Sequence, residues 1–447
     1  MASAVKSTVV NINDIQVFNS PEQYKQQLLL LIAAARTRIY ITALYLQGDD
    51  AGKEVLHALY QAKQNNPSLE VKIFVDFHRA QRGLIGVKNS LGNRAVYLEL
   101  EEQYEQSIDI YGVAVKSKEV FGVLHLKGMV FDDKVFYTGA SINDIYCNQH
   151  GRYRLDRYYQ INSETLAECF CRYLTVNFID SQLAPRLNGG PIPDKTEQKH
   201  IIQQMKGLVK KANYTLTWLK SAPQNALASE DNISITPLVG CGPRNNKLNK
   251  AIRKVVQKSE NELLILTPYF NLPKPLARDV NSALRRGVKV TLIIGDKTAN
   301  DFYISPDKPF TTIGIVPYLY EVLLARYVKK QQRNIDKGLL KIRLWKDGDN
   351  SFHLKGLVAD SRYHFITGSN LNPRAWALDL ENGLLLDDPK QQLMPAFEEE
   401  WQGLIKNTQL INHYRDIDSI NSYPEKPRQL LKKLRVVQID RLLKRFL

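Results

Sequence analysis

One short pattern occurs twice in this chain of 447 residues. Each copy reads His-x-Lys-x-x-x-x-Asp and is followed by a small-residue turn, an Asn and, further on, an acid. The first copy has His125, Lys127, Asp132, Asn143 and Asp156, and the second has His353, Lys355, Asp360, Asn372 and Glu381. A single copy is as well explained by a buried core histidine and a surface lysine. Two matching copies in a chain with only eight histidines indicate two related halves that share one site.

The spacing within each copy predicts where the side chains point. Side chains alternate between the two faces of a strand, so a histidine and the lysine two residues later project from the same face. The apolar residues around both motifs are typical of buried strands. If two such strands face each other, two imidazoles and two ammonium groups meet in one pocket.

Such a pocket suits phosphodiester chemistry. Lys127 and Lys355, together with Asn143 and Asn372, could hold the phosphate oxygens and offset the charge that grows in the transition state. One imidazole could attack phosphorus while the other protonates the leaving group. The two downstream acids, Asp156 and Glu381, could each hydrogen-bond a histidine and fix its tautomer. We interpret Asp132 and Asp360 as structural partners and not as proton carriers.

Length and composition set outer limits on the fold. The chain is too long for one ordinary core and fits two domains of about 200 residues. Its longest apolar run has eight residues, far short of the roughly 20 that a membrane-spanning helix needs. No signal peptide is visible, and the four cysteines show neither metal-ligand spacing nor a disulfide framework. We therefore expect a cytosolic, reduced protein without a metal.

The net charge of +15 is concentrated in two segments. Residues 326–346 and residues 426–447 each carry eight Lys or Arg and one Asp, a net +7 apiece. Basic patches of this size predict an anionic partner, either nucleic acid or an acidic lipid surface. For 326–346 a solvated charged face is the alternative.

The second basic segment is also amphipathic. Leu430, Leu431 and Leu434 fall on one helical face, with basic residues opposite, and a second apolar face begins at Ile439. This pattern is typical of an interfacial membrane anchor, although the leucines could instead dock on the protein itself. The residues predicted to contact the membrane are Lys432, Lys433, Arg435, Arg441, Lys444 and Arg445.

The order of predicted elements is the same in both halves. Helices are expected at 23–37, 53–63, 245–258 and 276–286, and strands at 38–45, 69–76, 262–269 and 288–295. This alternation predicts an α/β fold with mixed or parallel sheets. We place the first half at 1–187, a linker with a helix near 199–219 at 188–232, the second half at 233–410, and the basic segment at 411–447.

The paired motif resembles the phospholipase D superfamily, whose members join two such half-sites into one active site. Longer motifs resemble one branch of it, the bacterial phosphatidylserine synthases. These motifs are Ala43-Leu44-Tyr45-Leu46, Val75-Asp76-Phe77-His78-Arg79-Ala80-Gln81-Arg82-Gly83, Thr267-Pro268-Tyr269-Phe270-Asn271-Leu272-Pro273, Gly295-Asp296-Lys297-Thr298-Ala299-Asn300-Asp301-Phe302-Tyr303, Asn372-Pro373-Arg374-Ala375-Trp376 and His413-Tyr414-Arg415-Asp416. The similarity runs from about residue 15 to the C-terminus.

The resemblance implies a two-step phosphatidyl transfer without a cofactor or metal. His125 would attack the phosphatidyl phosphorus of CDP-diacylglycerol and expel CMP, with His353 as general acid. His353 would then act as base on the hydroxyl of L-serine. Arg79, Arg82, Lys297 and Arg374 lie in the branch motifs and are candidates for substrate binding, although each could equally form a structural salt bridge.

The resemblance also implies a cytoplasmic protein that associates peripherally with the inner face of the cytoplasmic membrane. Non-specific binding to ribosomes or nucleic acid and homo-oligomerisation are further expectations.

Two departures separate the motif copies. Ala140 stands where the second copy has Ser369, so that hydroxyl is missing or replaced by Ser141. The second copy also has one more residue between its Asp and its Gly. Three other functions stay open: cardiolipin synthesis, a nucleic-acid phosphodiesterase, and a non-catalytic membrane- or ribosome-binding protein.

Overall fold

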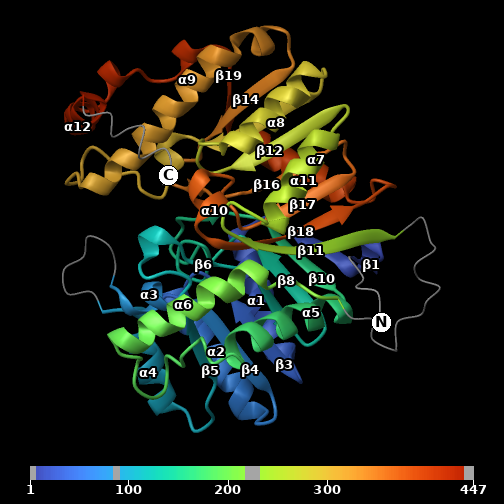
Figure 1. Ribbon diagram of the computed structural model, residues 1–447, viewed down its shortest axis with the longest axis vertical. Helices are drawn as coiled ribbons and strands as arrows, with labels where there is room; N and C mark the ends of the chain where they lie inside the picture. The colour runs from blue at the N-terminus through green and yellow to red at the C-terminus, as the bar shows by residue number, and fades with distance from the viewer. Residues whose placement is uncertain (1–6, 84–90, 217–231, 437–447) are drawn as a thin grey trace.

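The computed structural model describes residues 7–83, 91–216 and 232–436. It contains two mixed β-sheets, one for each half, flanked by helices. Figure 1 shows the halves stacked on each other, the first in blue to green and the second in yellow to red, with β6, β11 and β18 near the boundary. The α/β fold with mixed sheets predicted from the sequence is confirmed.

The first sheet has the strand order β2-β10-β8-β7-β3-β4-β5. Its strands are β2 (Ile15–Phe18), β3 (Arg38–Thr42), β4 (Glu70–Asp76), β5 (Asp109–Val113), β7 (Gly128–Phe131), β8 (Lys134–Thr138) and β10 (Tyr158–Asn162). Strands β3, β4 and β5 pair in parallel, and the remaining pairs are antiparallel.

The second sheet has the order β1-β11-β18-β17-β16-β12-β13-β14-β19, with β6 paired to β18. Its strands are β1 (Thr8–Val10), β6 (Leu124–His125), β11 (Ile233–Cys241), β12 (Glu262–Thr267), β13 (Lys289–Gly295), β14 (Leu340–Trp345), β16 (Gly356–Ala359), β17 (Tyr363–Thr367), β18 (Leu380–Asp387) and β19 (Thr408–Ile411). A separate two-stranded sheet joins β9 (Arg154–Leu155) to β15 (Ser351–Phe352).

Helices cover both sheets and follow the predicted order. They are α1 (Pro21–Ala34), α2 (Asp50–Asn65), α3 (Phe77–Gln81), α4 (Asn93–Gln103), α5 (Glu164–Leu174), α6 (Lys195–Lys211), α7 (Lys247–Lys258), α8 (Lys274–Arg285), α9 (Val316–Asp336), α10 (Pro373–Ala377), α11 (Met394–Lys406) and α12 (Glu425–Val436). The four helices and four strands expected from the sequence are all present, within a few residues of their predicted ends. Among the described residues, no helix is both long and apolar enough to cross a bilayer.

The sheets exchange strands, which the predicted domain boundaries did not anticipate. Strand β1 lies in the first half of the chain but pairs with β11 of the second sheet. Strand β6 of the first half joins the second sheet by pairing with β18, and β15 of the second half pairs with β9 of the first half in the separate two-stranded sheet. In the predicted linker, α6 begins and ends earlier than expected.

The prediction that each His-x-Lys motif lies in one continuous strand is wrong. β6 ends at His125 and β7 begins at Gly128, while β15 ends at Phe352, before His353, and β16 begins at Gly356. The two glycines have φ angles of 110° and 131°, values that side-chain-bearing residues rarely adopt. Gly128 therefore lets the chain turn from β6, which pairs with the second half, into β7 of the first sheet. Gly356 does the same between β15 and the second-sheet strand β16.

The basic C-terminal segment is described only as far as Val436, where α12 ends. Leu431 is buried against Tyr318 and Tyr423, and Leu430 and Leu434 pack around the same cluster. The interpretation of these leucines as a membrane-facing surface is therefore wrong, because they hold α12 on the protein. Lys432 and Lys433 are exposed. The side chain of Arg435, and all of Arg441, Lys444 and Arg445, lie outside what the structure describes.

Candidate active site

The exchanged strands bring both motif copies together where the two halves meet. β6 aligns His125 with Glu381 on β18, and the His125 Nδ1 atom lies 2.9 Å from Glu381 Oε2. In the mirror arrangement, the backbone N–H of His353 donates to the Leu155 carbonyl, and His353 Nδ1 lies 2.7 Å from Asp156 Oδ2. Each histidine is therefore oriented through its Nδ1 atom by the acid of the other half. The Nε2 atom of His353 lies 3.2 Å from the Tyr146 hydroxyl.

The two lysines are buried and make different contacts. The ammonium group of Lys127 donates to the Ser141 hydroxyl at 3.2 Å and to the Ala140 carbonyl at 3.4 Å. The ammonium group of Lys355 donates to Asp156 Oδ2 at 2.9 Å and contacts His353 Nδ1. Ser141 thus supplies the hydroxyl that Ala140 lacks.

Two glycines make room for this cluster. A Cβ atom at Gly139 would lie 2.7 Å from Asp156 Oδ1 and 3.0 Å from Lys355 Nζ. At the equivalent position in the second copy, a Cβ at Gly368 would lie 2.5 Å from Lys127 Cγ. The glycine of each half therefore packs against the motif lysine of the other half, which shows that both copies occupy one cluster.

The two asparagines sit at the edge of the cluster and cap turns. Asn143 accepts through its side-chain oxygen from the Tyr146 N–H at 3.0 Å, and Asn372 accepts from the Ala375 N–H at 2.9 Å. These bonds hold each amide with its oxygen toward the backbone, so the NH₂ group is the part that a ligand oxygen would contact. An NH₂ group is a donor, as the predicted contact with phosphate oxygens requires.

Asp132 and Asp360 lie outside the cluster, in tight turns. The Asp132 carboxylate accepts from the backbone N–H groups of Arg36, Thr37 and Arg38. Asp360 accepts from three consecutive N–H groups, those of Glu260, Asn261 and Glu262, in the same way. Each motif aspartate ties its hairpin to the start of the neighbouring strand, in agreement with its predicted structural role. The extra residue of the second copy lies in this hairpin, between Ala359 and Tyr363.

Burial and charge affect the two half-sites differently. Burial, with the charge of the nearest lysine, lowers the pKa of His125 well below its usual range. The same two causes lower the pKa of His353 to about 3, although Asp156 opposes the change. Burial raises the pKa of Glu381 to about 8 despite the positive charges of Lys127 and Lys355. Burial also favours the neutral form of Asp156, but Lys355 and His353 outweigh it and lower the pKa of that carboxyl.

The lysine of the first half-site is the more easily deprotonated. Burial lowers the pKa of Lys127 to about 7, and the charge of Lys355 adds to this effect. The pKa of Lys355 is also lowered by burial, but Asp156 opposes the change through both its charge and its hydrogen bond.

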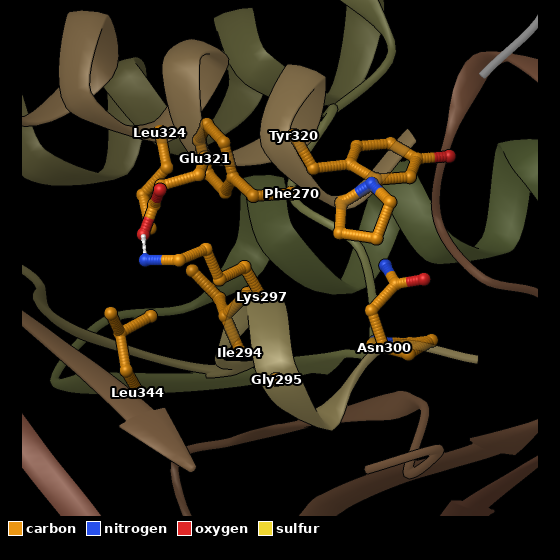
Figure 2. A pocket seen from close by; sticks show the side chains of 11 residues that line it. Phe270, Ile294, Gly295, Lys297, Asn300, Tyr320, Glu321, Leu324 and Leu344 are labelled. Atoms are coloured by element: carbon orange, nitrogen blue, oxygen red, sulfur yellow. Dashed lines mark hydrogen bonds and ion pairs between the residues drawn. The ribbon is translucent and has the colours of Figure 1, made fainter. Parts of the chain in front are cut away.

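The four arginine and lysine candidates from the branch motifs have other partners. Arg82 pairs with Glu119 at 2.5 Å, and Arg374 pairs with Asp379 at 3.3 Å. Lys297 forms ion pairs with Glu321 at 3.0 Å and with Asp418; Figure 2 shows its ammonium group directed at Glu321 across a small pocket. Arg79 stacks on the ring of Tyr45 at 4.8 Å, and within the described residues no acid lies within ion-pair distance of its guanidinium.

Sequence reasoning missed several residues that complete the site. Asn382 accepts from the backbone N–H of Lys127 at 2.8 Å and donates to its carbonyl at 2.7 Å, so it fixes the chain between β6 and β7. The Tyr146 hydroxyl lies 2.9 Å from His353 Nδ1. Arg154 and Asp301 form an ion pair beside Tyr146. These residues have no counterpart at the matching position of the other copy, so the repeat could not reveal them.

Within the described part of the chain, Asp50, half-buried Asp144 and His150 lie close enough together to hold a metal ion. None of them belongs to the paired motif.

Comparisons with known proteins agree with this geometry. Residues 28–148 and 252–401 match the model of the family described as "Cardiolipin synthase, PLD-like domain". The CDP-diacylglycerol–serine O-phosphatidyltransferase of Escherichia coli is 43% identical over 98% of this chain and 95% of its own length. The enzyme of the same name from Haemophilus influenzae is 42% identical over 97% of this chain and 94% of its own length.

A solved structure has the same fold. The crystal structure of phosphatidylserine synthase from Haemophilus influenzae superposes with a TM-score of 0.92 at 40% sequence identity, covering 99% of this chain and 97% of that one. With the paired motif in one buried cluster and these similarities over nearly the whole length, the chain belongs to the phospholipase-D-like family, in its phosphatidylserine synthase branch.

Proposed function

We propose that this protein transfers the phosphatidyl group of CDP-diacylglycerol to L-serine and releases CMP. The observation that carries the proposal is the crossed arrangement in which each motif histidine bonds the acid of the other half. The full-length similarity to two CDP-diacylglycerol–serine O-phosphatidyltransferases supplies the substrates.

The electrostatics support His125 as the nucleophile and His353 as the general acid. A nucleophilic imidazole must be neutral, whereas a general acid must carry a proton. Asp156 stays ionised and can stabilise an imidazolium at His353. Glu381, with its pKa near 8, holds a proton at neutral pH and offers His125 no such stabilisation. The negative charge of a bound diphosphate would raise the pKa of His353 and so load it with a proton.

The first step then forms a bond between His125 Nε2 and phosphorus and breaks the bond to the oxygen of CMP, which takes the proton of His353. Lys127, Lys355 and the NH₂ groups of Asn143 and Asn372 would bind the phosphoryl oxygens and stabilise the charge that develops on them. In the second step, neutral His353 takes the proton of the serine hydroxyl, whose oxygen bonds to phosphorus as the bond to His125 breaks.

Among the branch-motif residues, Arg79 is the best candidate for the leaving diphosphate. Its side chain stacks on Tyr45 and forms no ion pair with the described residues, so its donors remain available. Arg82 and Arg374 are instead bound to Glu119, through its carboxylate and its backbone carbonyl respectively. We propose that they shape this side of the site.

The deciding experiment measures CMP release by purified protein from CDP-diacylglycerol in mixed micelles, with and without L-serine. We expect serine-dependent release with one phosphatidylserine formed per CMP. Release that does not respond to serine would reject the proposal.

A second acceptor is worth testing, because the matching family model carries the name of cardiolipin synthase. Phosphatidylglycerol in place of serine would then yield cardiolipin. Product formation from phosphatidylglycerol alone would replace the serine assignment within the same chemistry.

We also propose that the protein associates peripherally with anionic membranes. Lys432 and Lys433 point into solvent from α12, and Val120 and Phe121 on the turn Glu119–Phe121 are 51% and 47% exposed. Each basic residue near an anionic leaflet contributes about 1 kcal/mol. Replacing the exposed Lys432 and Lys433 with Glu should therefore weaken sedimentation with phosphatidylglycerol-containing vesicles while leaving activity in micelles intact; unchanged sedimentation would exclude these lysines from the anchor.

A further inference from the structure

A second charged group lies beside His353 and takes no part in the chemistry described above. The Tyr146 hydroxyl contacts His353 Nδ1 at 2.9 Å, and the guanidinium of Arg154 lies over the Tyr146 ring at 4.8 Å. Arg154 Nε lies 2.9 Å from Asp301 Oδ1, while Asp301 Oδ2 accepts from the Tyr269 hydroxyl at 2.7 Å. One tyrosine ring thus separates the catalytic imidazole from an Arg–Asp pair.

This pair has unused hydrogen-bonding capacity. Arg154 Nε and Asp301 Oδ1 are buried atoms that make no hydrogen bond of acceptable geometry with the described residues, even though they lie close together. Of the five N–H donors of the guanidinium, one on Nη1 contacts the Tyr45 hydroxyl at 3.5 Å, and of the about four acceptor positions of the carboxylate, one binds the Tyr269 hydroxyl. The two side chains are 11% and 15% exposed, so a small part of each reaches solvent.

A second Arg–Asp pair, Arg374 and Asp379, lies near His125 and makes different contacts. Asp379 accepts from the backbone N–H of Val123 at 3.0 Å, and Arg374 donates to the Glu119 carbonyl at 2.6 Å. These backbone contacts give Arg374 and Asp379 a structural task, which Arg154 and Asp301 do not share. A buried ion pair is by itself weak evidence for stability, because desolvation offsets its attraction. The pair beside His353 therefore calls for another explanation.

We propose that Arg154 and Asp301 bind the charged groups of the amino-acid acceptor, an inference that rests on the proposed phosphatidyl transfer. Arg154 would donate to the α-carboxylate, and Asp301 would accept from the α-ammonium group. The hydroxyl of the bound serine is then presented to His353, which takes its proton as the oxygen bonds to phosphorus and the His125–phosphorus bond breaks. Opposite charges three bonds apart in the ligand match opposite charges 2.9 Å apart in the site.

The surrounding aromatic residues fit this role. Tyr269 stacks on Tyr320 with ring centroids 5.3 Å apart, and Figure 2 shows Tyr320 on the wall of the neighbouring pocket, opposite Asn300. Asn300 directly precedes Asp301 and accepts from the Phe302 N–H at 2.9 Å, which fixes the turn that carries the carboxylate. The Arg–Asp pair is thus held in place by rigid neighbours, as a recognition site requires.

The test separates acceptor binding from the first chemical step. In Asp301→Asn and Arg154→Gln, we expect the KM for L-serine to rise roughly 10- to 100-fold, the effect of losing a hydrogen bond to a charged group. Exchange of labelled CMP into CDP-diacylglycerol, measured without serine, should fall much less than serine transfer, because Asp301 is only one of the charges that raise the pKa of His353. The matched control is Asp279→Asn, which breaks an Arg–Asp pair on α7 and α8 and should change neither reading.

Acceptor analogues sharpen the assignment. Arg154→Gln should reduce the ratio of kcat/KM for L-serine to kcat/KM for 2-amino-1,3-propanediol, which lacks the carboxylate. Asp301→Asn should reduce the ratio of kcat/KM for L-serine to kcat/KM for 3-hydroxypropanoate, which lacks the ammonium group.

Several results would overturn the proposal. A parallel fall of CMP exchange and serine transfer would mean that the pair only positions His353, and an unchanged KM for serine would exclude it from acceptor binding. If wild-type protein catalyses no CMP exchange, the phosphatidyl-transfer mechanism itself fails. Should Asp301→Asn or Arg154→Gln not fold, Arg154→Lys, which keeps the charge but loses the planar fork, must still raise the KM for serine.

Discussion

The two half-sites share a sequence pattern, yet their charges are arranged differently. His353 bonds an acid whose pKa is lowered, and Lys355 bonds that same acid. His125 bonds an acid whose pKa is raised to about 8, and Lys127 bonds neutral groups instead. A duplicated motif has thus produced one half-site suited to hold a proton and another suited to stay neutral. Covalent transfer needs this asymmetry, because one histidine must attack while the other moves protons.

The largest expected effect comes from removing either histidine. His125→Ala and His353→Ala should each lower kcat by about 10⁴-fold or more, as loss of a nucleophile or its base does in hydrolases. Acid-quenched wild-type protein incubated with labelled CDP-diacylglycerol should carry an acid-labile phosphohistidine, and His125→Ala should not. An adduct mapped by mass spectrometry to His353 would reverse the roles of the half-sites.

Replacing the two acids by their amides should lower kcat to very different extents. Asp156→Asn removes the ionised partner of His353 and should reduce kcat by about 10³- to 10⁴-fold, as in a triad with the wrong tautomer. Glu381→Gln removes a carboxyl that is mostly protonated at pH 7, so about a tenfold loss is expected. Equal losses in the two variants, measured as CMP release at pH 7, would contradict the assigned asymmetry.

The lysines should differ in their pH dependence. The pKa of Lys127 is lowered to about 7, so its ammonium charge is present below pH 7 and is lost as the pH rises above it. Lys127→Met should therefore lower kcat/KM about 100-fold at pH 6 but by clearly less at pH 9. Because Asp156 stabilises the charged form of Lys355, the loss of kcat/KM in Lys355→Met should persist to a higher pH than the loss in Lys127→Met. Parallel pH profiles of the two variants would remove this distinction.

The smallest expected effects come from the paired glycines. Gly139→Ala and Gly368→Ala should each lower the free energy of unfolding by about 1–3 kcal/mol, because the added methyl group overlaps the Asp156 carboxylate in the first case and the Lys127 side chain in the second. The melting temperature should fall by roughly 1 °C per kcal/mol, given an unfolding entropy of about 2 cal/mol/K per residue. Gly139→Ala should lose more activity than Gly368→Ala, since its Cβ meets the Asp156 carboxylate and not an aliphatic stem.

Much of the fold could be predicted because it is encoded locally. The helix at α7 and the strand at β12 follow from apolar periodicity and lie within two residues of their expected ends. The sequence led to the wrong prediction of one continuous strand through each His-x-Lys motif. The strands are interrupted before Gly128 and Gly356, where the backbone packs against residues distant in the sequence. A Cβ at Gly128 would lie 2.5 Å from Phe170, a residue of α5 far along the chain.

The candidate site shows the same division. The histidines, lysines, asparagines and acids were found because duplication made them visible as a pair of patterns. Which acid serves which histidine was not visible, because the exchange of β6 and β15 between the halves decides it. The amphipathic pattern of α12 was visible too, but its apolar side has a partner within the protein that only the packing identifies.

The sequence by itself determined that two halves each supply a histidine, a lysine and an acid, since residue types and spacings are written in the chain. The tertiary structure alone decided the crossed pairing, the unequal protonation of the two acids, and the Arg154–Asp301 pair beside His353. The physical reason is that hydrogen bonding and pKa depend on which groups meet in a buried, poorly solvated space. These contacts join residues between 147 and 256 positions apart along the chain.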